Sequence, residues 1–141
     1  MCGISGVFNP NNKDINAKKI IDKIIKIQET RGPDDNGTWQ SKSREITLGH
    51  NRLSIIDLTK NGKQPFISQD NNLVITFNGE IYNYAEIKKE LLNKNIRFKS
   101  NTDTEVILES YKYWGFKFLE KLRGMFSFVI WDMLKKKINF C

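Results

Sequence analysis

The order in which the hydrophobic spacing changes along the chain restricts the fold more than any single residue does. Residues 3–8 form a short apolar segment, which predicts a buried strand. Over residues 14–29 the isoleucines recur at helical spacing, which predicts a helix with Asp14 as its N-cap. Two strands are expected next, over residues 46–55 and 73–77. The first half of the chain therefore places one helix between strands.

Turn and capping residues mark where the helices and strands of the second half of the chain begin and end. We expect the strand over 73–77 to stop at the pair Asn78-Gly79, because this dipeptide favours turns. Asn83 is a candidate N-cap for the helix that follows. Thr102 and Glu105 have the spacing of a capping box and open another helix.

The last segments return to strands. Residues 125–131 alternate as a strand, residues 132–137 are typical of a hairpin turn, and Ile138 begins another strand. The full order of elements predicts a mixed α and β domain with mainly antiparallel pairing and helices that cover packed sheets. Because the sequence stops just after it turns into a new strand, we expect a domain that is cut short at its C-terminal end.

Composition and charge narrow the class of protein. The 141 residues point to one domain, and 39% hydrophobic residues supply a core. The net charge is +7, but the lysines are spread along the chain and alternate with apolar residues, which argues against nucleic acid as the partner. No apolar run approaches the roughly 18 residues of a membrane span, so no membrane partner is expected.

The cysteines indicate the compartment. Cys2 and Cys141 lie at the two ends of the sequence and form neither a CxxC pair nor a metal-binding spacing. No basic and apolar leader precedes Cys2. We therefore expect a cytoplasmic protein with reduced thiols.

Cys2 is itself a candidate nucleophile. If Met1 is removed, Cys2 carries a thiol and a free α-amine on one residue. In water an α-amine titrates at roughly pH 7.7–8.0, so it can take a thiol proton near neutrality and later return it to a leaving amine. Met-Cys-Gly alone is weak support, because an N-terminal cysteine can also be incidental.

Three other positions suit the same chemistry, although each has a structural alternative. The Asn78 side chain and the Gly79 N–H are candidate donors to an oxyanion, unless they form a plain turn. Arg52 could clamp a carboxylate, unless it is an exposed arginine at a strand edge. Asp103 could accept from an ammonium group, unless it only stabilises the first turn of a helix. Together the four features describe a site for an α-amino acid with a side-chain amide, and glutamine fits.

These residues lie in segments that resemble the N-terminal glutaminase domain of class II glutamine amidotransferases, which are N-terminal-nucleophile hydrolases. The resemblance runs in the same order over nearly the whole chain and is nearest to glutamine-dependent asparagine synthetase. The matching segments are residues 1–4, 31–34, 50–57, 78–84, 102–108 and 122–132.

The resemblance implies an α+β fold, a four-layer αββα sandwich of antiparallel sheets over residues 1–141. It implies that Cys2 is the nucleophile with its α-amine as base, and that Asn78 and Gly79 form the oxyanion hole. It further implies that Arg52 binds the α-carboxylate of glutamine and that Asp103 binds its α-amine. The remaining implied pocket residues are Leu53, Ile55 and Glu80.

The implied reaction converts glutamine and water into glutamate and ammonia through a thioester and supplies nitrogen for asparagine synthesis. An ammonia-accepting synthetase domain, in the full-length protein or on a partner chain, is the implied partner, because residues 1–141 hold no phosphate-cradling glycine loop. ATP and Mg²⁺ are expected only for that synthetase domain, so we expect neither a cofactor nor a metal in this one. An incomplete sandwich leaves a sheet edge unpaired, which favours a homo-oligomer.

Three alternatives stay open. A conventional Cys–His hydrolase would use His50 as the base, whereas the amine mechanism leaves His50 to orient its strand neighbours. A non-catalytic or partly folded fragment would act only as a binding module. Residues 111–118 interleave cations and aromatic rings as nucleic-acid stacking surfaces do, although core packing at a helix end accounts for the same pattern.

Overall fold

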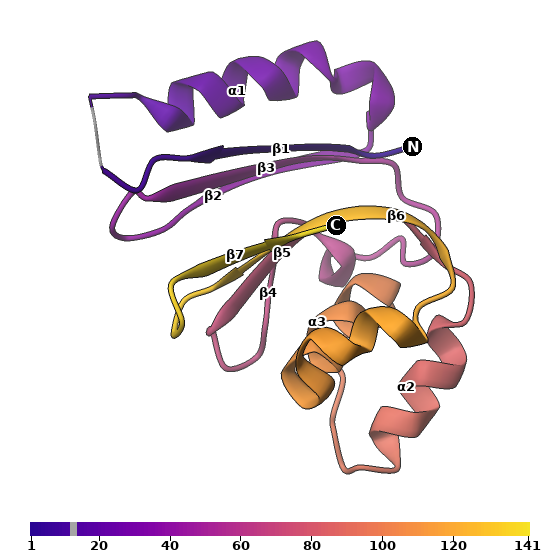
Figure 1. Cartoon of the computed structure of the whole chain (residues 1–141). Coiled ribbons are helices and arrows are strands. Elements are labelled where there is room, and N and C mark those ends of the chain that lie inside the picture. Colours follow the sequence, from indigo (N-terminus) through magenta and orange to yellow (C-terminus); the bar gives the residue numbers. More distant parts are fainter. Residues whose placement is uncertain (12–13) are drawn as a thin grey trace.

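The computed structural model describes residues 1–11 and 14–141. Two antiparallel sheets lie face to face, with one helix over the outer face of the first sheet and two helices over the outer face of the second (Figure 1). The layers therefore follow the order α, β, β, α, which confirms the predicted α+β sandwich of antiparallel sheets.

The first sheet has the order β1-β3-β2, with β1 at Gly3–Phe8, β3 at Ile46–Arg52 and β2 at Asp35–Gln40. Both pairings are antiparallel, and every residue of the central strand β3 is buried. Helix α1, Ala17–Ile27, covers this sheet with one apolar face (Figure 1). The helix sits close because Gly49 has no side chain, and a Cβ atom there would overlap α1.

The second sheet has the order β4-β5-β6-β7 and is also antiparallel. Strand β4 is Phe66–Ile67, β5 is Leu73–Ile81, β6 is Gly124–Asp132 and β7 is Lys137–Phe140. The long pair β5 and β6 forms the centre of the sheet, and β7 lies at one edge (Figure 1). The predicted hairpin after residue 131 is thus confirmed.

Helices α2, Tyr84–Leu92, and α3, Asp103–Trp114, cover the outer face of the second sheet (Figure 1). Gly115 ends α3 with a positive φ of 58°, a conformation that glycine adopts without steric cost. The larger core lies between these helices and the sheet, and its fully buried members include Ile75, Ile81, Leu91, Val106, Ile107, Leu108 and Ile130.

The two sheets meet where β3 crosses β5. Thr76 Oγ1 donates to Gly49 O at 3.1 Å, and His50 Nε2 lies 3.1 Å from Phe77 O. A smaller apolar cluster fills the rest of this layer, from residues Ile46, Leu48, Val74 and Trp131. Because these contacts fix the end of β3 against the middle of β5, they also fix the residues that follow on each strand.

The predicted stop at Asn78-Gly79 is wrong. Strand β5 continues through this pair to Ile81, because β6 pairs with it along its whole length. Gly79 has a φ of 149°, and a Cβ atom there would lie 2.3 Å from Met125 O. The pair therefore forms a close backbone contact inside a sheet and not a turn.

Two other boundaries differ from prediction, and two strands are additional. Helix α1 begins at Ala17, because the side chain of Asn16 and not that of Asp14 accepts from a first-turn N–H, at 3.0 Å. The strand expected over 46–55 ends at Arg52, because its antiparallel partners β1 and β2 begin there and no described pairing continues beyond it. Strands β2 and β4 were not expected, since their sequences are polar or very short.

Only one of the two hydrogen bonds of the predicted capping box at α3 is present. Thr102 Oγ1 accepts from Glu105 N at 3.2 Å, whereas the Glu105 carboxylate turns away to the preceding loop. Asn83 precedes α2, but its side chain binds Lys121 O and Arg123 N instead of capping the helix. In the described part of the chain, no helix is both long and apolar enough to cross a membrane.

Candidate active site

One cavity of about 290 Å³ lies where the start of β1 and the end of β3 face β5 and the start of α3. It brings together every site residue that the sequence predicts, although these residues come from four separate segments. They are Cys2, Arg52, Leu53, Ile55, Asn78, Gly79, Glu80 and Asp103.

The Cys2 thiol lies at one wall of this cavity. Cys2 directly precedes β1, and Leu53 directly follows β3, so the antiparallel pairing of these strands brings the two residues together. Leu53 N donates to Cys2 Sγ at 3.4 Å, and the thiol lies 3.7 Å from Leu53 O. Arg31 Nε donates to Cys2 O at 3.3 Å, which fixes the backbone beside the half-buried thiol.

The alternation of backbone hydrogen bonds in β5 directs the Gly79 N–H toward the cavity. In an antiparallel pair, successive residues face opposite neighbours. Phe128, the partner of Phe77 on β6, exchanges its hydrogen bonds with Cys141, so the backbone of Phe77 faces away from β6. Gly79 is two residues further along β5 and therefore faces the same way, beside the half-buried Asn78.

Arg52, the last residue of β3, is 8% exposed and borders the cavity. Its Nη1 donates to Thr59 O at 3.0 Å, and its Nη2 donates to Asp57 O. Gly62 makes room for it, since a Cβ atom there would overlap the guanidinium. Among the residues that the structure describes, no salt bridge involves Arg52, so an entering carboxylate would find the positive charge unpaired.

Asp103, the first residue of α3, brings a carboxylate to another part of the cavity wall. It is 5% exposed, and its Oδ2 accepts from Ile81 N at 3.2 Å. Burial penalises the charged form and raises the pKa of Asp103 to about 6, and this effect outweighs the hydrogen bond from Ile81, which lowers the pKa. An ammonium group placed here would stabilise the charged carboxylate.

The mouth of the cavity is formed by exposed residues. Ile55 lies on the loop after β3 and is 74% exposed. Glu80 is an exposed residue of β5 that the cavity also touches. A lining residue that the sequence analysis missed is Gln64, which is buried and bonded to Phe77. A glutamine before a proline carries no signal of such a contact.

Two alternative uses of other residues do not fit the structure. His50 is fully buried and does not line the cavity, and burial lowers its pKa to about 4, which is unsuitable for a general base near neutrality. Tyr111 and Phe118 are buried in the core, so the aromatic residues over 111–118 do not form one exposed stacking surface.

Comparison with known proteins shows which family the chain belongs to. Residues 1–141 match the family described as "Glutamine amidotransferase domain". "Asparagine synthetase [glutamine-hydrolyzing] 1" of Bacillus subtilis is 41% identical over 134 residues, which cover 94% of this chain and 21% of that protein. "Amidase chry2" of Gibberella zeae is 35% identical over 147 residues, which cover 98% of this chain and 22% of that protein.

The fold has a solved counterpart. Glutamine phosphoribosylpyrophosphate amidotransferase from B. subtilis superposes with a TM-score of 0.77 at 20% identity, covering 92% of this chain and 35% of that one.

The chain spans about a fifth of the length of the two curated relatives, the asparagine synthetase and the amidase. By sequence match and fold it belongs to the glutamine amidotransferase domain family, among the asparagine-synthetase-like proteins.

Proposed function

We propose that this chain hydrolyses the side-chain amide of glutamine to glutamate and ammonia, with Cys2 as the nucleophile. The observation that carries the proposal is the convergence of a thiol, an arginine, a buried carboxylate and a cavity-facing N–H on one cavity of about 290 Å³. No two of these groups are neighbours on a single helix or turn, so their convergence follows from tertiary packing alone.

Recognition of the amino-acid end rests on opposite charges. The α-carboxylate of glutamine would pair with the Arg52 guanidinium, whose described partners are carbonyl oxygens. Its α-ammonium would pair with Asp103, whose buried carboxylate accepts from backbone N–H groups and has no described cation partner. An ammonium group there offsets the desolvation that raises the pKa of Asp103. The amide would then extend toward Cys2.

The chemical step needs Cys2 at the N-terminus. After removal of Met1, the α-amine of Cys2 accepts the thiol proton, and sulfur attacks the amide carbon. The negative oxygen that forms is bound by the Asn78 side-chain amide and the Gly79 N–H. The protonated amine then donates to the leaving nitrogen, ammonia departs, and water cleaves the thioester with the amine again as base.

The proposed hydrolysis uses side chains and backbone groups of this chain without a nucleotide or a metal. In this proposal ATP and Mg²⁺ belong to the reaction that consumes the ammonia, which is carried out by a synthetase domain of the longer protein or of a partner. The B. subtilis relative is named as a glutamine-hydrolysing asparagine synthetase, which makes aspartate the acceptor that we propose.

The test compares two forms of the N-terminus. A chain that carries a non-cleavable extension ahead of Cys2 should fold and release no ammonia from glutamine, whereas the chain with Cys2 first should be active. Intact mass after treatment with a glutamine-analogue thiol alkylator reports the state of Met1 and the modification of Cys2 together. Cys141→Ser is the matched control, since Cys141 is exposed and lies outside the cavity.

Two results would contradict the proposal. Equal ammonia release from the extended chain would exclude the amine mechanism. Labelling of Cys2 without any release of ammonia by the free-terminus chain would leave binding as its only role.

A further inference from the structure

The peptide that precedes the Asn78-Gly79 pair is held by side chains rather than by a strand. Strand β4 pairs with β5 only at Phe66–Ile75 and Ile67–Val74. Continuing this register two residues back would place residue 64 opposite Phe77, but strand β4 begins only at Phe66. The Phe77 backbone therefore needs another partner on this edge.

The Gln64 side chain supplies that partner. Its Oε1 accepts from Phe77 N at 2.7 Å, and its Nε2 donates to Phe77 O at 3.2 Å. One side-chain amide thus binds both polar groups of Phe77, as a neighbouring strand would. Gln64 Nε2 also lies 3.4 Å from Thr104 Oγ1, so it joins β5 to the first turn of α3 beside Asp103.

His50 binds the same carbonyl from the other sheet. Its Nε2 lies 3.1 Å from Phe77 O, and it must be the donor because a carbonyl oxygen only accepts. The ring is fully buried, and its Nδ1 has no partner among the described residues. Gly37, the partner of His50 on β2, lacks a side chain, and a Cβ atom there would overlap Gln64 O. This gap lets the Gln64 segment lie over the sheet.

The two donors fix a peptide plane that the proposed reaction uses. The Phe77 carbonyl and the Asn78 nitrogen belong to one planar group, so holding the oxygen restricts rotation of the backbone that enters Asn78. We propose that Gln64 and His50 are positioning residues, which hold the Phe77 peptide so that the Asn78 side-chain amide and the Gly79 backbone N–H point at the developing oxyanion. This inference rests on the proposed glutaminase function.

We call the contacts of Gln64 and His50 with Phe77 the clamp. The experiment measures kcat and KM for glutamine in variants of these two residues. Gln64→Met and His50→Leu should each lower kcat about 10- to 100-fold and leave KM within about threefold, because misplaced donors affect the transition state more than substrate binding. His50→Gln should restore kcat to within about threefold of the parent, since its Nε2 can donate from a similar place but cannot act as a base.

Thr76→Val is the matched control. It removes the neighbouring bond between the sheets, Thr76 Oγ1 to Gly49 O, without touching Phe77 O. It should lower the melting temperature and leave kcat near that of the parent. Equal kcat losses in Thr76→Val and His50→Leu would reduce His50 to a general structural role. An equal loss in His50→Gln and His50→Leu, or a loss in KM alone, would also overturn the inference.

A second readout separates this inference from the proposed function. In ¹⁵N-labelled protein, Gln64→Met and His50→Leu should shift the Asn78 side-chain and Gly79 backbone amide signals, and Thr76→Val should not. If the parent releases no ammonia but these signals move, the positioning role of Gln64 and His50 is confirmed and the proposed glutaminase function is wrong. If the parent is active and the signals and kcat stay unchanged, the clamp is wrong. If one of the variants Gln64→Met and His50→Leu does not fold, the variant at the other position tests the inference.

Discussion

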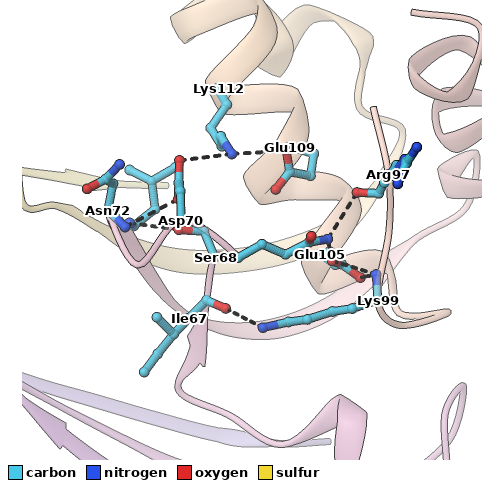
Figure 2. Close-up of polar contacts among 11 residues, drawn as sticks. Ile67, Ser68, Asp70, Asn72, Arg97, Lys99, Glu105, Glu109 and Lys112 are labelled. Atoms are coloured by element: carbon cyan, nitrogen blue, oxygen red, sulfur yellow. Dashed lines mark hydrogen bonds and ion pairs between the residues drawn. The ribbon is translucent and has the colours of Figure 1, made fainter. Parts of the chain in front are cut away.

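Two buried carboxylates at the start of α3 face different surroundings. Asp103 and Glu105 are 5% and 1% exposed and lie two residues apart, which on a helix separates their directions by about 200°. Asp103 borders the candidate active-site cavity. Glu105 belongs to a polar network on the other flank of the helix, which Figure 2 shows in close-up.

Glu105 is saturated with donors. Its carboxylate accepts from Lys99 N at 3.0 and 3.1 Å, from Ser100 N and Ser100 Oγ at 2.7 Å, and from Gln69 Nε2 at 3.3 Å. These donors belong to the loop before α3 and to the turn after β4, so Glu105 joins three segments (Figure 2).

Asp103 has only backbone donors and no described cation partner. The comparison teaches that burial and proximity to a helix N-terminus do not by themselves assign a role to a carboxylate. What decides is whether the surrounding donors already satisfy it. The hydrogen-bonding capacity of the Glu105 carboxylate is filled by donors of the fold, whereas the Asp103 carboxylate can still accept from a ligand.

The largest expected effect is on stability. Glu105→Ala leaves the donors of Lys99, Ser100 and Gln69 without their acceptor, and we expect the free energy of unfolding to fall by about 3–5 kcal/mol. Urea unfolding measures this, with the exposed Glu86→Ala as the control. If both variants lose the same small amount, the network does not stabilise the fold.

Asp103→Asn should show the opposite pattern. We expect glutamine to bind about 100-fold more weakly, since the ammonium group loses its counter-charge, which corresponds to about 2.7 kcal/mol. Stability at pH 8 should be kept or raised, because a carboxylate whose folded pKa is raised from 3.8 to about 6 costs stability above that pH. Calorimetric binding to the Cys2→Ala form measures the first effect. Unchanged affinity would remove Asp103 from the recognition site.

The pH dependence of binding sharpens the same contrast. Because burial raises the pKa of Asp103 to about 6, its charge is lost as the pH falls through that value. We expect glutamine affinity of the Cys2→Ala form to decrease about tenfold per pH unit below 6 and to be nearly constant from 7 to 8. The Asp103→Asn form should lack this dependence. A titration that begins only near pH 4 would contradict the assigned group.

The smallest effect is expected at the outer part of the network. Lys112 Nζ lies 3.1 Å from Asp70 Oδ2 and 3.4 Å from Glu109 Oε2 (Figure 2). Because Lys112 is partly exposed, Lys112→Met should cost about 1 kcal/mol near neutral pH. Burial raises the pKa of Glu109, so the cost should shrink in acid as that group takes a proton. Thermal unfolding at two pH values tests this, and an equal cost at both would exclude the pair with Glu109 as its origin, since the lowered pKa of Asp70 keeps that partner charged in acid.

Local sequence predicted much of the frame. Helical spacing of apolar residues indicated α1, Asn83 indicated that a helix follows β5, and Thr102 indicated the start of α3. The candidate site residues followed from side-chain chemistry and from family resemblance, and all of them line one cavity. These features depend on side chains near in sequence or on the types of group present, so the residues alone contain them.

Tertiary structure decided the rest. Asn78-Gly79 favours a turn locally, but pairing with β6 along nine residues outweighs that preference and keeps the pair in β5. The clamp on Phe77 joins positions 27 and 13 residues apart in the chain, and no local pattern records it. Likewise, the sequence determined that Asp103 and Glu105 begin a helix, and only packing decided which of them is left to face a cavity, because the available donors come from distant segments.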